Sequence, residues 1–465
     1  MTRQFLPLPI LLFLFVGVVS ADDRPNFIIF VADDMAWDDC GAYGHPSIRT
    51  PNIDALAKAG MRFDRAYLTC SSCSPSRCSI LTGRYPHATG AGELHLPLPA
   101  KQTMLTQPLK QSGYWTAAVG KWHLGEAVAH QVDYRKGSPP PKMGDAWVAA
   151  LKERPTGKPF FLWAAHTDPH RGYKPGAVDP PHQSTDVIVP PSLPDTPRVR
   201  EDLALYYDEI SRFDEHIGMT LAELDRQAIA DNTFVLVISD NGRPFPYAKT
   251  MVHVPGVRTP FVVRWPAKVT AGSDCDSVVS TVDIAPTILE LAGLEPLASF
   301  QGKSLSKILS NPKLTTRRYA FAEHNWHDYR AFERGVHSQS YCYVRNWLPD
   351  TPGTPPADAV TSVTFADMKQ LREQGKLAAI QEATSFATPR PTEFLYDVSS
   401  DPDCLRNLAN DKQHHAILDE MRSALADWQA QTDDQFPGAD RLTPDGFDRS
   451  TGKRLITAAH PSLQR

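Results

Sequence analysis

The sequence predicts an α/β protein in which a mostly parallel sheet is flanked by helices, with a smaller domain at the C-terminal end. Four short runs are continuously apolar, which indicates strands buried on both faces, and helical patterns lie between them. After removal of a leader, about 444 residues remain, which suits one large plus one small domain. Hydrophobic residues make up 42% and charged residues 22%, which excludes disorder throughout the chain. A net charge of −5 gives no basic surface for nucleic acid.

The apolar runs predict four strands, each followed by polar residues. These strands are Phe27–Ala32, Thr116–Val119, Phe160–Ala165 and Phe234–Ser239. Between the last two, Glu201–Leu224 carries apolar residues on one helical stripe, which we interpret as core-facing. Asp283 and Pro286 mark the start of a later helix, and Tyr319–Ala322 is predicted as a further strand.

Residues 1–21 are predicted to be a secretory signal peptide. Arg3 supplies the positive start, residues 10–19 form the apolar core, and Val19-Ser20-Ala21 is a small-residue cleavage site. We therefore expect an exported protein (periplasmic, extracellular or in a lysosome-like compartment) with no membrane segment after cleavage; a retained anchor is the alternative. The seven cysteines are an odd number, so at least one thiol stays unpaired or has a chemical use.

Hard oxygen donors follow two of the predicted strands. Asp33 and Asp34 come after the first strand, and Asp240 and Asn241 come after the fourth. In an open α/β sheet, ligands bind beyond the carboxyl ends of the strands, so these side chains should meet at one edge. Carboxylate and amide oxygens suit Ca²⁺ or Mg²⁺ rather than zinc.

Two other strands deliver groups for binding and proton transfer to the same edge. Lys121 and His123 are two residues apart, so their side chains would point the same way if the chain stays extended. His170 follows Pro169 at the end of the third strand, and we interpret it and His123 as catalytic. His166 fits a hydrogen-bonded core histidine better.

Cys73 precedes a Ser74-Pro75-Ser76 helix start, so it lies at a helix N-terminus, where anions are favoured. One interpretation of this position is a reactive thiol with a low pKa. The longer string is more specific: Cys73-Ser74-Pro75-Ser76-Arg77, followed by Leu81-Thr82-Gly83-Arg84.

This string resembles the signature of the type I sulfatases, in which the cysteine of C-x-P-x-R is oxidised to formylglycine by a separate maturation enzyme. The resemblance covers nearly the whole mature chain. Its segments are residues 25–44, 50–67, 120–125, 168–170, 239–242, 281–293 and 393–411. It implies an alkaline-phosphatase-like α/β domain followed by a smaller C-terminal domain with an antiparallel sheet.

The resemblance also assigns roles residue by residue. The implied Ca²⁺ ligands are Asp33, Asp34, Asp240 and Asn241. Cys73 becomes the formylglycine nucleophile, Arg77 stabilises it, and Lys121, His123, His170 and Lys249 are the remaining active-site positions. One hydroxyl of the hydrated aldehyde attacks sulfur, and His123 deprotonates the second, so that the gem-diol collapses and releases sulfate. His170 or Lys249 protonates the leaving atom.

Three segments are more similar to the sulfamidase branch, the heparan N-sulfatase-like enzymes, than to arylsulfatases. They are Asp168–Arg171, Asp240–Pro246 and Val187–Leu203. The substrate implied is a sulfated saccharide, an N-sulfoglucosamine of the heparan type. Lys249 departs from that branch, which has arginine there, and agrees with the wider family. The residues expected to contact substrate outside the common motifs are Arg171, His324, His327 and Arg330; a surface loop is the alternative for the last three.

Other functions stay open at this point. One is a carbohydrate O-sulfatase or an arylsulfatase, and another is a phosphodiesterase or phosphonate hydrolase on the same scaffold. A binding protein with an unmodified Cys73 is a third, although the complete motif and metal set argue against it. The expected division is residues 22–340 for the catalytic domain and 341–465 for the C-terminal subdomain.

Overall fold

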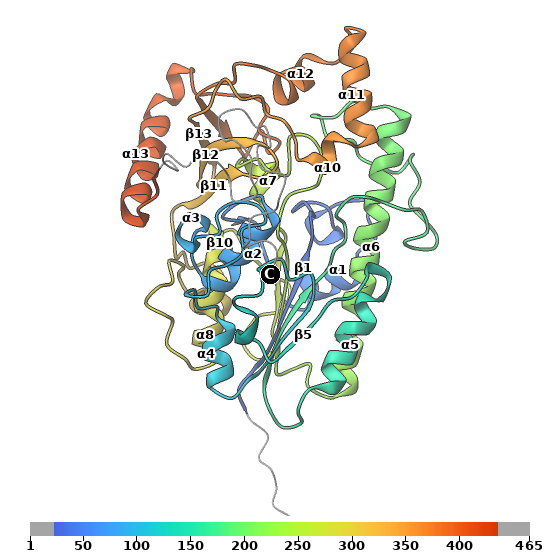
Figure 1. Ribbon diagram of the computed structural model, residues 1–465, viewed down its shortest axis with the longest axis vertical. Coiled ribbons are helices and arrows are strands. Elements are labelled where there is room, and N and C mark those ends of the chain that lie inside the picture. The colour runs from blue at the N-terminus through green and yellow to red at the C-terminus, as the bar shows by residue number, and fades with distance from the viewer. Residues whose placement is uncertain (1–22, 436–465) are drawn as a thin grey trace, which may run out of the picture.

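The computed structural model describes residues 23–435, so the predicted signal peptide lies outside the described residues. Its centre is an eight-stranded mixed sheet in the order β5-β4-β6-β1-β7-β8-β2-β9 (Figure 1). The strands are β1 (Asn26–Ala32), β2 (Met61–Phe63), β4 (Trp115–Gly120), β5 (Tyr134–Lys136), β6 (Phe160–Ala165), β7 (Thr233–Ser239), β8 (Phe261–Arg264) and β9 (Ser273–Cys275). The run from β5 to β7 is parallel, and β8 is antiparallel to both its neighbours. All four predicted strands are confirmed.

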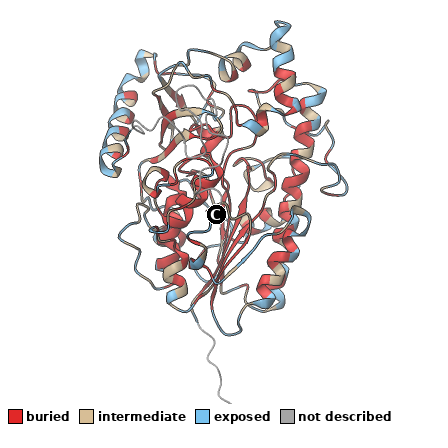
Figure 2. Ribbon diagram, in the orientation of Figure 1, coloured by how far each residue is buried: buried red, intermediate tan, exposed pale blue. Residues whose placement is uncertain are grey.

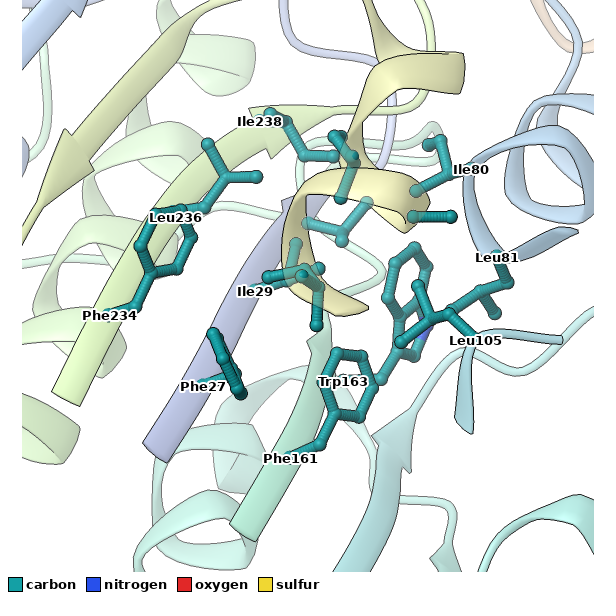
Figure 3. Close-up of a cluster of buried hydrophobic side chains, with 14 of the residues drawn as sticks. Phe27, Ile29, Ile80, Leu81, Leu105, Phe161, Trp163, Phe234, Leu236 and Ile238 are labelled. Carbon is teal, nitrogen blue, oxygen red and sulfur yellow. The ribbon is translucent and has the colours of Figure 1, made fainter. Parts of the chain in front are cut away.

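The central strands are apolar throughout because both faces of the sheet are covered, as the buried colouring in Figure 2 shows. Alternate residues of β1 enter two separate clusters of buried side chains, Phe27 and Ile29 on one face and Ile28 and Phe30 on the other. Figure 3 shows the first cluster, where Phe27 and Ile29 lie with side chains of β6 and β7. Parallel strands buried in this way need no polar alternation.

Helices cover the two faces of the sheet. One face carries α2 (Cys73–Thr82), α4 (Thr106–Gln111), α8 (Ile284–Leu291) and α9 (Ser306–Ser310). The other carries α1 (Pro51–Lys58), α5 (Met143–Glu153), α6 (Pro197–Arg226) and α11 (Val363–Glu373). The short helices α3 (Pro86–Thr89) and α7 (Val254–Val257) lie in connections.

Two predicted helices are confirmed, the first with an altered start and the second with Asp283 at its N-cap as predicted. In α6 the predicted stripe is buried, and the helix begins four residues earlier than the apolar pattern because the Thr196 hydroxyl accepts the Val199 amide at its N-cap. Before α8, residues Thr281–Asp283 form a 3-10 turn held by a capping box between Ser280 and Asp283. Asp283 therefore ends this turn, and the α-helix starts one residue later.

The C-terminal part forms a second, antiparallel sheet, as expected. Its order is β11 (Ala320–Trp326), β12 (Arg330–His337), β13 (Tyr341–Asn346) and β14 (Glu393–Asp397). Three further helices are α10 (Ala357–Val360), α12 (Ala379–Ser385) and α13 (His415–Thr432), and a two-stranded pair joins β3 (Ala66–Tyr67) to β10 (Val279–Ser280). The predicted boundary after residue 340 falls between β12 and β13, and the division into domains stays a prediction.

Two features concern the rest of the described chain. All seven cysteines are buried and none is in a disulfide. Among residues 23–435, no helix combines the length and the apolarity that a membrane crossing requires.

Candidate active site

The site lies where β1 and β7, adjacent parallel strands, end in register at Ala32 and Ser239. Asp33 and Asp34 continue from β1 and Asp240 from β7. Carboxylate oxygens of these three residues and the Cys73 sulfur all lie within 4.8 Å of one another. The strand-end pattern therefore predicted the meeting of these groups correctly.

Asn241 and the local backbone lock the carboxylates together. The Asn241 Nδ2 donates to Asp34 Oδ1 and to Asp240 Oδ1, at 2.8 Å each, and lies 3.1 Å from the Cys73 Sγ. Asp34 has a φ of 79°, a left-handed conformation that non-glycine residues adopt only when the surroundings hold it. Its amide donates to Asp240 Oδ1 at 3.2 Å, which couples the two strand ends.

Helix α2 presents both the cysteine and the arginine of the C-x-P-x-R motif. Cys73 is its first residue, every residue of α2 is buried, and Arg77 follows one turn later. Arg77 donates from Nε to Asp240 Oδ2 at 2.7 Å and from a terminal nitrogen to the Lys121 carbonyl at 3.0 Å. Burial raises the pKa of the Cys73 thiol and outweighs the opposing effect of Lys121 and Lys249. The interpretation as a reactive, low-pKa thiol is therefore wrong.

Two lysines, Lys249 buried and Lys121 partly buried, balance the carboxylates. Lys121 Nζ lies 2.6 Å from Asp33 Oδ2, and Lys249 Nζ lies 2.6 Å from Asp34 Oδ2. Burial opposes their charge, but the carboxylates raise the pKa of both ammonium groups, so both stay protonated. Burial raises the pKa of Asp240 to about 7, with Asp33 and Asp34 adding to the effect.

The donor set fits a hard divalent cation. Asp33 Oδ1 and Asn241 Oδ1 are buried and accept no hydrogen bond, so both have lone pairs free for a cation. The atoms available as metal ligands here are carboxylate and amide oxygens, which Ca²⁺ prefers. A cation here would also offset the mutual repulsion of Asp33, Asp34 and Asp240.

The histidines take different positions. His170 Nε2 lies 3.8 Å from Asp34 Oδ2, at the mouth of the cluster, with its side chain 32% exposed. The His123 ring centroid is 5.1 Å from that of His95. Burial lowers the pKa of His123, and the positive charge of Lys121 lowers it further, so the imidazole is neutral. His123 has a φ of 59°, so the chain leaves the extended conformation and the expected parallel aim of Lys121 and His123 does not apply. His166 is the predicted core histidine: it is fully buried and hydrogen-bonded to His216 and to the Asp168 amide.

The residues expected to contact substrate are placed less uniformly. His327 is next to the site, with Nδ1 2.8 Å from the Ser72 hydroxyl, directly before Cys73. His324 lies inside β11 rather than after a strand, because that strand continues to Trp326, and burial lowers its pKa to about 4. Arg330 begins β12 and pairs with Trp326.

Arg171 does not have a free guanidinium. Its terminal nitrogens form a two-pronged ion pair with Asp202 at 2.8 and 2.9 Å, and its Nε donates to the Pro244 carbonyl at 2.7 Å. Its guanidinium also stacks 4.3 Å from the Phe245 ring centroid. This geometry favours a bracing role over the expected contact with substrate.

Sequence reasoning missed Asp358. Its Oδ2 lies 3.3 Å from Lys249 Nζ and 3.5 Å from His170 Nε2. It lies in the short helix α10, which belongs to no motif, and the proline-rich segment before it predicts only a loop at the substrate opening and no particular side chain.

Comparisons with known proteins agree with this geometry. The family model described as Sulfatase matches residues 25–294, and the one described as N-sulphoglucosamine sulphohydrolase, C-terminal, matches residues 245–349. N-sulphoglucosamine sulphohydrolase of Homo sapiens is 30% identical to this chain, over 94% of this chain and 95% of its own length. An ulvan-active sulfatase of Formosa agariphila is 28% identical, over 87% of this chain and 75% of its own length.

A solved structure shares the fold. It is of a protein in complex with its substrate, D-glucosamine-2-N,6-O-disulfate, and has a TM-score of 0.71 at 20% identity, covering 90% of this chain and 100% of that one. The alkaline-phosphatase-like α/β fold and the sulfatase activity that the sequence predicted are thus confirmed. The Sulfatase model spans more than half of the chain, and the human relative aligns along nearly all of it. The chain therefore belongs to the sulfatase family and is a hydrolase of sulfate esters or sulfamates, of the type similar to N-sulphoglucosamine sulphohydrolase.

Proposed function

We propose that this sulfatase cleaves the N-sulfate of a terminal glucosamine in heparan-type saccharides. The observation that carries the proposal is the end-to-end similarity to N-sulphoglucosamine sulphohydrolase, which includes the C-terminal model over residues 245–349. The region that this model matches reaches the site, since it includes the position of Lys249, although lysine there is the residue of the wider family. Export, with residues 1–21 as signal peptide, would bring the enzyme to such a substrate.

Formylglycine made from Cys73 is the proposed nucleophile. The buried thiol stays protonated and is therefore a poor nucleophile itself, which makes sense of a site that needs chemical maturation. The hydrated aldehyde of formylglycine supplies one hydroxyl for attack on sulfur and a second through which sulfate is released. The hydroxyls of the hydrated aldehyde would have polar partners, because the Asn241 amide and the carboxylates already lie around the sulfur of residue 73.

Ca²⁺ is the proposed cation, held by Asp33, Asp34, Asp240 and Asn241, with Mg²⁺ the second choice for oxygen ligands. When bound, it supplies positive charge that stabilises an ionised hydroxyl and the sulfate oxygens. Arg77 holds Asp240 through its Nε and lies 3.7 Å from Asp33, so it orients two ligands at once.

The protein groups then divide the remaining work. Lys121 and Lys249 each present an ammonium at the cluster and bind sulfate oxygens. Neutral His123 accepts the proton of the second hydroxyl, because a base must be unprotonated to act. His170, at the mouth of the site, donates a proton to the leaving nitrogen.

A carbohydrate O-sulfatase is the second candidate. Lys249 favours it, since lysine agrees with the wider sulfatase family rather than the sulfamidase branch, and an ulvan-active sulfatase is among the relatives. Steady-state assays of matured enzyme on N-sulfoglucosamine, 6-O-sulfated glucosamine and nitrophenyl sulfate decide between the two. Sulfate release from O-sulfated sugars alone would contradict the proposal. Mass spectrometry of the peptide that contains Cys73 tests the formylglycine separately, because an unmodified thiol in active enzyme would exclude it.

A further inference from the structure

We infer that the carboxylate of Asp358 forms a subsite for the leaving nitrogen and makes this site favour N-sulfates over O-sulfates whose oxygen leaves without a proton. The inference rests on the proposed sulfamidase function and names a residue that carries the preference. Asp358 is an unusual feature of the site, because it places a carboxylate at the mouth of a site that binds an anion.

The position of Asp358 is built rather than incidental. Its Oδ2 is 3.5 Å from the Nε2 of His170, the proposed proton donor to the leaving nitrogen, and 3.3 Å from the Nζ of Lys249, a proposed sulfate-binding group. Its Oδ1 accepts the Ala359 amide at 2.8 Å, and the Ala357 amide donates to Asp328 at 2.6 Å, so α10 is anchored at its first turn. The side chain is 20% exposed, which leaves it open to a ligand.

Asp358 is charged, and the ammonium group of Lys249 is its positively charged partner. Burial opposes ionisation, but Lys249 and His170 lower its pKa, so it is a carboxylate. Oxygens of Asp34 and Asp358 and a nitrogen of His170 lie within 4.8 Å of one another, the spacing of a metal site. The Lys249 ammonium contacts both carboxylates, at 2.6 and 3.3 Å, and so supplies the positive charge that a second metal would bring.

A carboxylate beside bound sulfate opposes binding through Coulomb repulsion. Its presence therefore needs a compensating gain elsewhere in the reaction, and the leaving group offers one. During cleavage of a sulfamate, the nitrogen takes the proton of His170, the S–N bond breaks, its electron pair stays on nitrogen, and the sulfuryl group passes to the nucleophilic oxygen. Positive charge develops on nitrogen as it is protonated, and the fixed negative charge of Asp358 stabilises it.

For an O-sulfate whose oxygen leaves without a proton, the effect of the Asp358 charge on the transition state is reversed. When the S–O bond of an aryl sulfate breaks, the electron pair stays on oxygen, which becomes negative as the sulfuryl group leaves. The same carboxylate then destabilises the transition state. One residue thus raises the rate for nitrogen leaving groups and lowers it for unprotonated oxygen leaving groups, which is specificity by charge rather than by shape.

The test compares kcat/KM of the wild type and Asp358→Asn on N-sulfoglucosamine and on nitrophenyl sulfate. We expect a loss of about tenfold or more on the N-sulfate, in line with the removal of one transition-state electrostatic contact, and a gain on the aryl sulfate. Asp358→Glu should keep part of the preference. Asp350→Asn is the matched control, since Asp350 is exposed in the same segment, and it should change neither rate.

Each outcome has one meaning. Equal losses on both substrates would show that Asp358 only holds α10 in place, which overturns the inference and leaves the proposed function standing. A wild type that cleaves O-sulfates and no N-sulfate would overturn the proposed function itself. Melting temperatures report folding, and Asp358→Ser, whose hydroxyl can still accept the Ala359 amide, gives the same comparison if Asp358→Asn folds poorly.

Discussion

The carboxylate cluster predicts that Ca²⁺ raises the melting temperature of this protein. Asp33, Asp34 and Asp240 are buried together, and the raised pKa of Asp240, about 7, reflects burial and the repulsion of its neighbours. An ion that binds only the folded state, at a hundred times its Kd, stabilises that state by about 2.7 kcal/mol. Residues 23–435 should unfold with an entropy of about 0.9 kcal/mol/K. The expected rise is therefore about 3 °C over chelator-treated protein.

The assay is thermal unfolding in chelator, followed by titration with CaCl₂, MgCl₂ or ZnCl₂ at constant ionic strength. Asp240→Asn keeps the side-chain volume and an acceptor for Arg77 but removes one charge, so the Ca²⁺-dependent rise should vanish while the metal-free melting temperature changes little. Asp231→Asn, at a side chain that is 94% exposed, is the control and should respond like the wild type. The reasoning fails if Asp240→Asn keeps the full Ca²⁺ response, or if Zn²⁺ stabilises the protein and Ca²⁺ does not.

Three further predictions concern other parts of the molecule. Cys73→Ala should abolish turnover and shift the free energy of unfolding by less than about 1 kcal/mol; sulfate release and thermal melts test this, and substantial residual activity would contradict it. His170→Ala should lose about 10²-fold or more in kcat on N-sulfoglucosamine and far less on nitrophenyl sulfate, whose phenolate leaves unaided; equal losses in steady-state kinetics would exclude a role in protonating nitrogen. The pKa of His87 is raised because Glu323 and Asp434 outweigh its burial, so this stabilisation is complete below about pH 6.5 and is lost as the pH rises through the folded pKa. Between about pH 6.5 and the folded pKa of His87, the melting temperature should fall with rising pH in the wild type and fall less in His87→Gln. Identical pH profiles would show that protonated His87 contributes nothing to stability.

The parts of the fold that were predictable are those buried on both faces. Strands β1, β6 and β7 are apolar except at the ends of β1 and β7 because helices cover both sides, and such runs stand out without any alternation. Strand β11 was predicted to end at Ala322 and continues to Trp326. It is an edge strand of its sheet, where polar residues are tolerated, and Glu323 pairs across the ladder with Arg334. That pairing depends on a residue eleven positions away, which a local pattern does not reveal.

The residues of the site also fall into those that the sequence pattern predicts and those that it does not. Asp33, Asp34, Asp240 and Asn241 directly follow strands, so the rule that parallel strands share a carboxyl edge brings them together. Lys249 lies ten residues after β7 and was assigned only by family resemblance. Asp358 was not assigned at all, because only the tertiary structure shows that α10 returns to the catalytic edge.

Arg171 shows why a motif that marks a branch of a family need not contact its substrate. Arg171 lies directly after His170 in a segment that is similar to the sulfamidase branch, and on that basis it was expected to contact substrate. In the structure its guanidinium connects Asp202 of α6, the Pro244 carbonyl and the Phe245 ring, so it joins all three of the sulfamidase-like segments. A residue occupied on every side acts on substrate only by fixing its neighbour, His170. Asp358 of α10, 20% exposed and 3.5 Å from His170, is the group from the C-terminal region that reaches the mouth of the site. Substrate choice in this enzyme should therefore respond to changes in α10 more than to changes at Arg171, which should lower the rates on all substrates together.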